Sequence, residues 1–305
     1  MNELEFKADS NNTVKQILPQ EEIALKISQN IDQPPAYLIP KTFSFSQIKS
    51  YNTCPYQYKL SYIIKLPIAQ THYFSFGNTI HNTLHEFYKL VQILNSARQE
   101  SLFDQPAQPV KKNTGAIKVP DLDELFKIYE NQWQGNWFLS AKQREKYHED
   151  GKKMLSVFYK KQANHWTVPL ALESGFNIKI EDFSIKGRID RIDRQTDGRL
   201  NIIDYKTGAG KEKAQGDEKD QLLLYQIAVS SLPQYSAWGE IGQLSLYYIK
   251  DDMIANFLGQ EKDMARQKEK ISQTANKIKK GIFKATPEKN ACKYCHFRDI
   301  CEFKI

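Results

Sequence analysis

Apolar residues recur along this chain at two spacings, which predict a mainly helical part followed by a β-rich part. In the stretch FGNTIHNTLHEFYKLVQIL, apolar side chains return every three or four residues, the period of an amphipathic helix. Two further helices are expected at about 121–139 and 143–165. Upstream, SFSQIKSYNTCPYQYKLSYI predicts a helix that is capped by a serine, breaks at Cys54 and Pro55, and then resumes.

The β-rich part begins near residue 170 and consists of apolar runs separated by turn sequences. LALESGFNIKI, FSIKGRIDRID and RLNIIDYKTG are joined by short turns, so they predict an antiparallel meander. The helix DQLLLYQIAVSSL, the strand GQLSLYYIK and a long amphipathic helix over about 257–283 follow. The elements predict an α/β fold: a mixed, mostly antiparallel central sheet flanked by helices, with a helical insertion over about 86–168.

Composition restricts the class of protein more than its function. The chain has 305 residues, of which 40% are hydrophobic, enough for the core of one large domain. Residues 1–40 are polar and predict a leader or loosely attached segment, which leaves 41–305 as the domain. No apolar run approaches about 18 residues and no secretory signal is visible, so we expect no membrane span and a cytoplasmic location. The net charge of +7 favours an anionic partner such as nucleic acid.

The strand RLNIIDYKTG carries a carboxylate and a lysine where a buried strand would be apolar. Side chains alternate along a strand, so Ile202, Asp204 and Lys206 share one face. Apolar residues also occupy the other face, so the strand is expected to be covered on both sides. Asp190 ends the preceding strand and is expected near Asp204 across the pair.

This pattern has two interpretations. A salt bridge between Asp204 and Lys206 at a strand end is common and contributes little stability. The alternative is a metal site, because two carboxylates bind a hard cation such as Mg²⁺ or Mn²⁺. Lys206 would then orient or deprotonate the attacking water and offset charge in the transition state.

The four cysteines form a second candidate site. Cys54 stands far upstream of Cys292, Cys295 and Cys301, which lie together in the tail CKYCHFRDIC. Disulfides are not expected in a reducing compartment. Three closely spaced thiolates and one remote thiolate supply the four ligands that a [4Fe–4S] cluster or a structural zinc requires. Either group would connect the two ends of the domain, and we call this link the staple.

Three other patterns have ordinary interpretations. His81 and His85 show a zinc-like H-x3-H spacing, but no carboxylate follows in the zinc-protease pattern, so His85 is expected to be structural or at the surface. TGAGKEK lacks the first glycine of a phosphate-binding loop and predicts a flexible loop, so no ATP-binding motor is visible. The tyrosines of SYNTCPYQYKLSYI are expected to pack around the cysteine-bound group rather than to stack on bases.

These segments, in this order, resemble the PD-(D/E)XK nuclease superfamily, in particular its RecB- and AddB-like members. GRID is similar to the motif with the first aspartate, IIDYKTG to the D-x-K motif, and QLLLY to the Q-x-x-x-Y motif. FGNTIHNTLHEF resembles the helix with a metal-binding histidine. SYNTCPYQY and CKYCHFRDIC resemble the iron–sulfur staple of AddB, exonuclease V and CRISPR-adaptation nucleases. The resemblance spans about residues 43–303.

The resemblance implies roles for individual residues. His81, Asp190 and Asp204 would hold the divalent metal, with the backbone carbonyl of Tyr205 as a further ligand. Lys206 would serve the nucleophilic water. The family's proline ahead of the first acidic residue is replaced here by an isoleucine, a departure that is usual in the RecB-like branch.

The resemblance also implies supporting residues and a cofactor. Gln221 and Tyr225, four residues apart on one helix face, would support the site or contact the DNA backbone. Glu173 matches an acidic position on the strand before the first aspartate. The cysteine-bound group would be a [4Fe–4S] cluster, held by Cys54, Cys292, Cys295 and Cys301.

The function implied is metal-dependent hydrolysis of DNA phosphodiester bonds, exonucleolytic on single-stranded ends, in DNA repair or recombination. The expected partners are DNA and a helicase or recombination protein. Three alternatives stay open: a catalytically idle nuclease-fold subunit that binds DNA or serves as a scaffold, a CRISPR-adaptation nuclease, and a zinc-stapled structural module.

Overall fold

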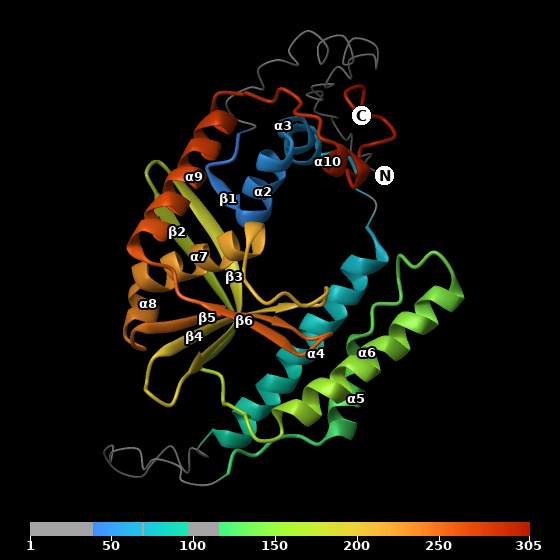
Figure 1. The fold of residues 1–305 in the computed structure, drawn as a ribbon, viewed down its shortest axis with the longest axis vertical. Helices are drawn as coiled ribbons and strands as arrows, with labels where there is room; N and C mark the ends of the chain where they lie inside the picture. Colours follow the sequence, from blue (N-terminus) through green and yellow to red (C-terminus); the bar gives the residue numbers. More distant parts are fainter. Residues whose placement is uncertain (1–38, 69, 97–115) are drawn as a thin grey trace, which may run out of the picture.

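The structure is a computed structural model that describes residues 39–68, 70–96 and 116–305 (Figure 1). Nearly all of the predicted leader, residues 1–40, lies outside these described residues. In chain order the elements are β1 (Thr42–Ser44), α2 (Phe45–Thr53), α3 (Pro55–Tyr58), the π-helical turn η2 (Lys59–Ile63), α4 (His72–Asn95), α5 (Leu122–Gln132), α6 (Ala141–Gln162), β2 (Ala171–Ile180), β3 (Phe183–Arg194), β4 (Leu200–Lys206), α7 (Gly216–Ser231), α8 (Pro233–Ser236), β5 (Ile241–Tyr248), β6 (Met253–Phe257), α9 (Glu261–Lys279) and α10 (Lys289–Lys293).

A six-stranded sheet forms the centre of the fold. The pairs β2–β3, β3–β4 and β5–β6 are antiparallel, whereas β1–β3 and β4–β5 are parallel. Strand β2 follows one side of β3, and β1 and β4 share its other side at opposite ends. Helix α7 makes the crossover that the parallel pair β4–β5 requires. The predicted α/β fold with a mixed, mostly antiparallel sheet flanked by helices is confirmed.

The sheet separates two hydrophobic cores. One core joins the sheet to α2, α7 and α9, and the other joins it to α4, α5 and α6. Strand β4 belongs to both, because Leu200 and Ile202 lie in the first core and Ile203 and Tyr205 in the second. Figure 1 shows α4, α5 and α6 together as a helical layer beside the sheet. The strand that carries the D-x-K motif is therefore covered on both faces.

Local sequence sets several element boundaries. Ser44 caps α2 in a capping box: its hydroxyl accepts from the Gln47 N–H at 3.2 Å, and the Gln47 side chain accepts from the Ser44 N–H at 2.7 Å. The helix breaks at Cys54, directly before Pro55, as predicted.

Three parts of the fold differ from the sequence prediction. Helix α4 begins at His72, one turn before the stretch FGNTIHNTLHEFYKLVQIL for which the apolar period predicts a helix. Residues 253–257 form the edge strand β6, and the long helix begins only at Glu261. The short strand β1 was not predicted, because a three-residue run carries no readable alternation.

The N-terminal segment of the domain and its C-terminal tail lie side by side. The Tyr51 hydroxyl donates to the carbonyl of Ile282 at 2.5 Å, and Tyr58 stacks on Phe283 with ring centroids 5.9 Å apart. The four cysteines line one small cavity between these two segments. No helix in the described part of the chain is long and apolar enough to cross a membrane.

Candidate metal-dependent active site

The candidate site lies where strands β3 and β4 stop pairing. The last pair of their ladder is Arg191 with Ile203, and continuing the same register would place Asp190 opposite Asp204. The strands part at this point, and the backbone N–H of Tyr205 donates to Asp190 Oδ2 at 2.9 Å instead. Two carboxylates therefore face each other across an opening at the end of the ladder.

A third carboxylate reaches the same point from β2. Glu173 lies opposite Asp190, between the pairs Leu172–Arg191 and Ser174–Ile189. Its φ of +46° places it in the left-handed region, which a residue with a side chain rarely adopts within a strand. Strain of this kind is typical of functional sites.

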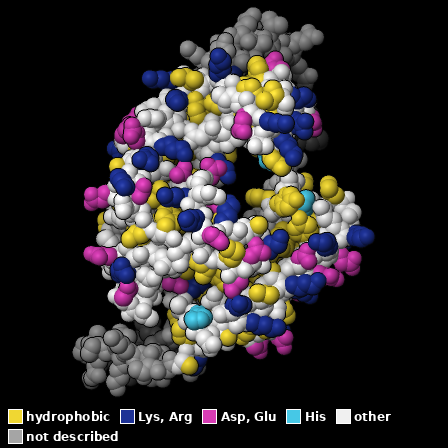
Figure 2. All heavy atoms as spheres, viewed as in Figure 1, with side chains coloured by type: hydrophobic (Ala, Val, Ile, Leu, Met, Phe, Trp, Pro, Cys, Tyr) yellow, Lys and Arg dark blue, Asp and Glu magenta, His cyan; other side chains and the backbone are white. Residues whose placement is uncertain are grey.

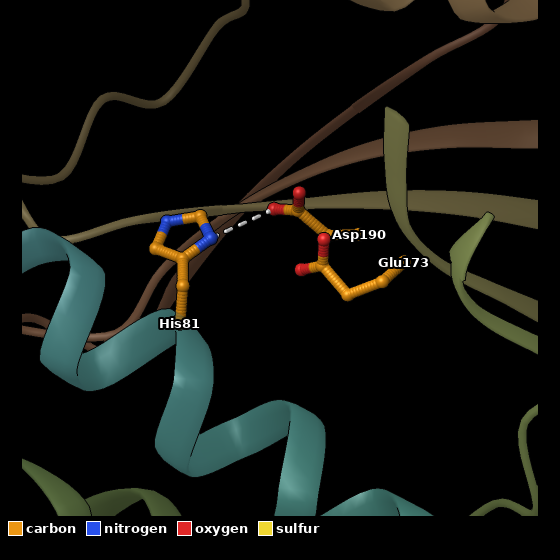
Figure 3. Close-up of side chains that lie close together, drawn as sticks. All are labelled: His81, Glu173 and Asp190. Carbon is orange, nitrogen blue, oxygen red and sulfur yellow. Dashed lines mark ion pairs between the residues drawn. The ribbon is translucent and has the colours of Figure 1, made fainter. Parts of the chain in front are cut away.

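Helix α4 contributes a histidine to this cluster. His81 Nδ1 lies 3.3 Å from Asp190 Oδ2. His81, Glu173 and Asp190 each present a ligand atom, and these three atoms lie within 4.8 Å of one another. Figure 3 shows the imidazole directed from α4 toward the two carboxylates. His81 follows the fully buried Ile80 in the apolar stripe of the helix, which brings its side chain to the margin of the sheet.

Asp204 is buried, and one of its carboxylate oxygens contacts the Lys206 ammonium in an ion pair. This Oδ2 lies 2.5 Å from Lys206 Nζ, and beyond this contact the oxygen has no hydrogen-bond partner among the described residues. Burial, followed by the charge of Asp190, raises the pKa of Asp204 to about 6, although Lys206 and His81 act in the opposite direction. Burial and the neighbouring Asp190 together therefore disfavour the charged form of Asp204.

Two neighbouring groups, Glu173 and His81, also have shifted pKa values. Burial raises the pKa of Glu173, and the charge of Asp190 raises it further. Burial lowers the pKa of His81, but its hydrogen bond with Asp190 and the charge of that residue reverse the shift, so this pKa is raised. The charge of Asp190 therefore raises the pKa of both neighbouring groups.

Lys206 is held at the rim of the site by helix α7. Its ammonium donates to Gln221 Oε1 at 3.1 Å, and Gln221 Nε2 donates to the hydroxyl of Tyr225 at 2.7 Å. Burial lowers the pKa of Lys206, but the charge and hydrogen bonding of Asp204 raise it above its usual value. Lys206 is therefore protonated at neutral pH, and it acts as a donor and a positive charge in this state.

A buried ionic network lies behind the site, on the other face of the sheet. The Arg191 guanidinium donates to both Asp193 oxygens, at 2.7 and 2.5 Å, and to the Tyr205 hydroxyl at 3.0 Å. It also lies 3.7 Å from the ring centroid of Tyr88. This network fixes Tyr205, whose N–H holds Asp190. It was not predicted from the sequence, although strand alternation places Arg191 and Asp193 on the face opposite Asp190.

The structure therefore brings together most of the residues that the sequence singled out. His81, Glu173 and Asp190 form the compact group of potential ligands, and Asp204 with Lys206 lies across the opening. Gln221 and Tyr225 reach the site from α7. His85 lies one helical turn beyond His81, where its Nε2 is 3.5 Å from Glu86 Oε1, and it does not belong to the ligand group.

A model of the PD-(D/E)XK nuclease superfamily matches residues 42–302. The chain is also similar to one subunit of the ATP-dependent helicase/deoxyribonuclease of Clostridium perfringens strain SM101, with 26% identity over 230 residues, covering 62% of this chain and 17% of that protein. The same protein from two other strains of this species matches equally well. The chain thus spans less than a fifth of the length of these relatives.

Among solved structures, one described as "Crystal structure of SSO0001" aligns with 93% of this chain and 97% of its own chain. The sequence identity is 16% and the TM-score is 0.37.

Proposed function

We propose, given that this chain belongs to the PD-(D/E)XK nuclease superfamily, that it is a divalent-metal-dependent deoxyribonuclease acting on single-stranded DNA ends. The observation that carries this proposal is the convergence of His81, Glu173 and Asp190 on one point, with Asp204 and Lys206 across the opening. Carboxylate oxygens with one imidazole suit a hard or borderline cation such as Mg²⁺ or Mn²⁺.

The residues present fit such a cation. The Oδ2 of Asp204 is a buried oxygen paired with Lys206, and burial together with the charge of Asp190 still raises the pKa of this carboxyl, so a cation beside it would be stabilised. We assign His81, Asp190 and Asp204 as the protein ligands, with the backbone carbonyl of Tyr205 as a further ligand. Glu173 reaches the same point from β2 and would bind the cation directly or through water.

When bound, the cation would supply Lewis-acid polarisation of the scissile phosphate and a water of lowered pKa. The protein's own groups would position the reactants. Lys206, protonated and next to Asp204, would donate a hydrogen bond to the attacking water or to a phosphate oxygen and offset the negative charge of the transition state. Gln221 would keep the ammonium in place, and Tyr225 would keep Gln221 in place.

The preference for single strands is supported by the shape of the molecule. Figure 2 shows a hollow in the middle of one face, with Lys and Arg side chains around it. In the same view of Figure 1, α4 borders this hollow on one side and α2 and α3 border it on the other. A passage between these elements would lead a single strand along α4, the helix that carries His81.

We further propose that a helicase supplies the strand during DNA repair or recombination. The name of the matched relatives joins helicase and deoxyribonuclease, and this chain matches 17% of their length. In this proposal, the nuclease part acts on the strand that a separate motor unwinds.

The cysteines are proposed to bind a [4Fe–4S] cluster. All four line one cavity, and burial, followed by the other three cysteines, raises the pKa of the Cys295 thiol. Four thiolates are the ligand set of such a cluster, and a structural zinc accepts the same set.

The cofactor proposal is tested by metal analysis of protein purified without oxygen. We expect about four irons per chain and the brown colour of an iron–sulfur protein. Asp190→Asn is the control and should keep the same iron content, because it leaves the cysteines intact. One zinc per chain without iron would show that the cysteines bind a structural zinc and not a cluster.

The nuclease proposal is tested by incubation with end-labelled single- and double-stranded DNA. We expect Mg²⁺-dependent release of short products from single-stranded ends, and no cleavage in EDTA. Asp190→Asn should reduce the rate by several orders of magnitude, whereas Asp197→Asn, in the exposed turn between β3 and β4, should not. Wild-type protein that binds DNA but cleaves none with Mg²⁺ or Mn²⁺ would establish the catalytically idle subunit instead.

A further inference from the structure

A groove of about 710 Å³ begins directly beside the candidate active site. It lies between the N-terminal end of α4, the middle of α6 and the loops that follow β4 and β5, and we call it the α4–α6 groove. Six of its lining residues carry the argument: Tyr73, Lys146, Tyr147, Lys153, Thr207 and Lys250.

The groove is continuous with the site through α4. Thr207 follows Lys206, and a Cβ at Gly77 would come within 3.8 Å of the Thr207 hydroxyl, so α4 passes close to the end of β4. Tyr73, Gly77 and His81 recur every four residues along one side of α4. Tyr73 therefore lies about 12 Å along the helix from His81, at a rise of about 1.5 Å per residue. That distance corresponds to about three nucleotides of a stacked strand.

The groove exposes aromatic rings that packing alone does not explain. Tyr73 is 67% exposed, although its ring contacts that of His72 with centroids 4.0 Å apart. The rings of Tyr73 and Tyr147 lie 6.3 Å apart at 76°, and the His72 ring lies 5.2 Å from Tyr147. These contacts pack Tyr147 against its aromatic neighbours, while most of the Tyr73 side chain remains exposed to solvent. Figure 2 shows hydrophobic side chains bordering the hollow near the N-terminal end of α4.

The charge of the groove is positive. Lys146, Lys153 and Lys250 line it together with one acid, Asp150, which pairs with Lys146 at 3.0 Å. Among the described residues, Lys153 and Lys250 have no ion-pair partner. An exposed ring beside two such lysines matches the two chemical faces of a nucleotide, a flat base and an anionic phosphate.

We propose that the α4–α6 groove binds single-stranded DNA about three nucleotides from the scissile phosphate, with a base stacked on Tyr73 and phosphates bound by Lys153 and Lys250. This inference rests on the proposed nuclease function, because the strand in the groove would be the one that enters the metal site. Stacking on an aromatic ring accepts any base, so the groove would hold the strand without selecting its sequence.

The test measures binding of a fluorescent oligothymidylate in Ca²⁺, and of the same oligomer with one abasic residue at successive positions. Tyr73→Ala should bind the intact oligomer about 5- to 50-fold more weakly. It should also lose the wild-type sensitivity to one abasic position, while Tyr73→Trp retains both. Phe74→Ala is the matched control: Phe74 is the next residue on α4, is 53% exposed and does not line the groove. The melting temperature of each variant verifies folding.

The lysines are tested by the salt dependence of the same binding. Lys153→Gln and Lys250→Gln should each reduce the slope of log affinity against log salt by about 0.7. Lys160→Gln, on the same helix as Lys153 but outside the groove, should leave the slope unchanged.

Two results would contradict DNA binding in the groove. One is wild-type affinity and abasic sensitivity in Tyr73→Ala, and the other is an equal loss of DNA affinity in Phe74→Ala. Neither affects the proposed nuclease function, which is measured separately as Mg²⁺-dependent cleavage by the wild-type protein. Conversely, the wild-type protein could be sensitive to the abasic position, with Tyr73→Ala insensitive, and yet cleave no DNA. That result would support the DNA-binding role of the groove and contradict the proposed nuclease function.

Discussion

Asp190 and Asp204 occupy facing positions immediately beyond the last backbone pair of β3 and β4. Each strand carries its carboxylate just past the point where the ladder ends. The acids therefore share an opening that no backbone hydrogen bonds fill, and the Tyr205 N–H holds one of them in place. This relationship makes the site a place where negative charge accumulates at the margin of a well-packed sheet.

Asp204→Asn should stabilise the metal-free protein while abolishing cleavage. The substitution removes a buried charge whose pKa is raised to about 6, a shift equivalent to about 3 kcal/mol as an upper limit. We expect the melting temperature in EDTA to rise by several degrees and the Mg²⁺-dependent cleavage rate to fall by several orders of magnitude. A lower melting temperature would mean that Asp204 contributes to the fold without a metal.

The free energy of unfolding should depend on pH differently in the wild-type protein and in Asp204→Asn. The folded-state pKa of Asp204 lies above that of the unfolded chain, so the folded state binds the extra proton between about pH 4 and 6. The wild-type free energy of unfolding in EDTA should therefore decrease, relative to the variant, as pH rises through this interval. Asp190, Lys206 and His81 face Asp204 in both proteins, so only the difference between the two denaturation curves is compared. A difference that is constant with pH would contradict the raised pKa.

Lys206→Ala should separate metal binding from catalysis. The ammonium is not a metal ligand, so the Mg²⁺ concentration for half-maximal activity should change little, whereas the maximal rate should fall by about 10²- to 10³-fold. DNA affinity in Ca²⁺ should stay close to wild type, because most binding energy comes from other basic groups. Lys270→Ala, which removes an exposed lysine paired with Asp220, is the control. If Lys206→Ala cleaved DNA at the wild-type rate, Lys206 would have no role in the reaction.

Cys301→Ser should weaken the connection between the two ends of the domain. Loss of one ligand releases the tail, so the melting temperature and the protease resistance should both decrease, and cleavage should fall with them. The stacking of Tyr58 on Phe283 remains and should preserve part of the contact. A variant that loses cleavage at an unchanged melting temperature would show that the cysteines act directly on the reaction.

Arg191→Met should strongly destabilise the fold. It leaves the buried Asp193 carboxylate without its cation, with the Thr167 hydroxyl still donating to it, and removing one member of a buried ion pair costs about 3–5 kcal/mol. Arg199→Met removes the exposed pair with Asp197 and should leave the free energy of unfolding almost unchanged. Urea denaturation of both variants measures the difference. Equal losses would mean that the buried network is not the basis of the effect.

The order and type of most elements could be predicted from the amino-acid sequence. The serine cap and the Cys54–Pro55 break are local hydrogen-bonding and steric effects, so they could be recognised without the rest of the chain. The period of two likewise placed Asp204 and Lys206 on one face of β4. The edge strands β1 and β6 were missed because short strands depend on long-range pairing, such as that of Thr42 with Ser184.

Which groups meet at the site depends on tertiary packing. Glu173 joins His81 and Asp190 because its backbone turns into the left-handed region inside β2, a conformation that no local pattern encodes. Helix α4 starts at His72 and carries a glycine past the end of β4, and this close approach delivers His81 to the acids. Periodicity specifies the face on which a side chain lies. The distances between side chains on different elements follow from how the helical layer packs against the sheet.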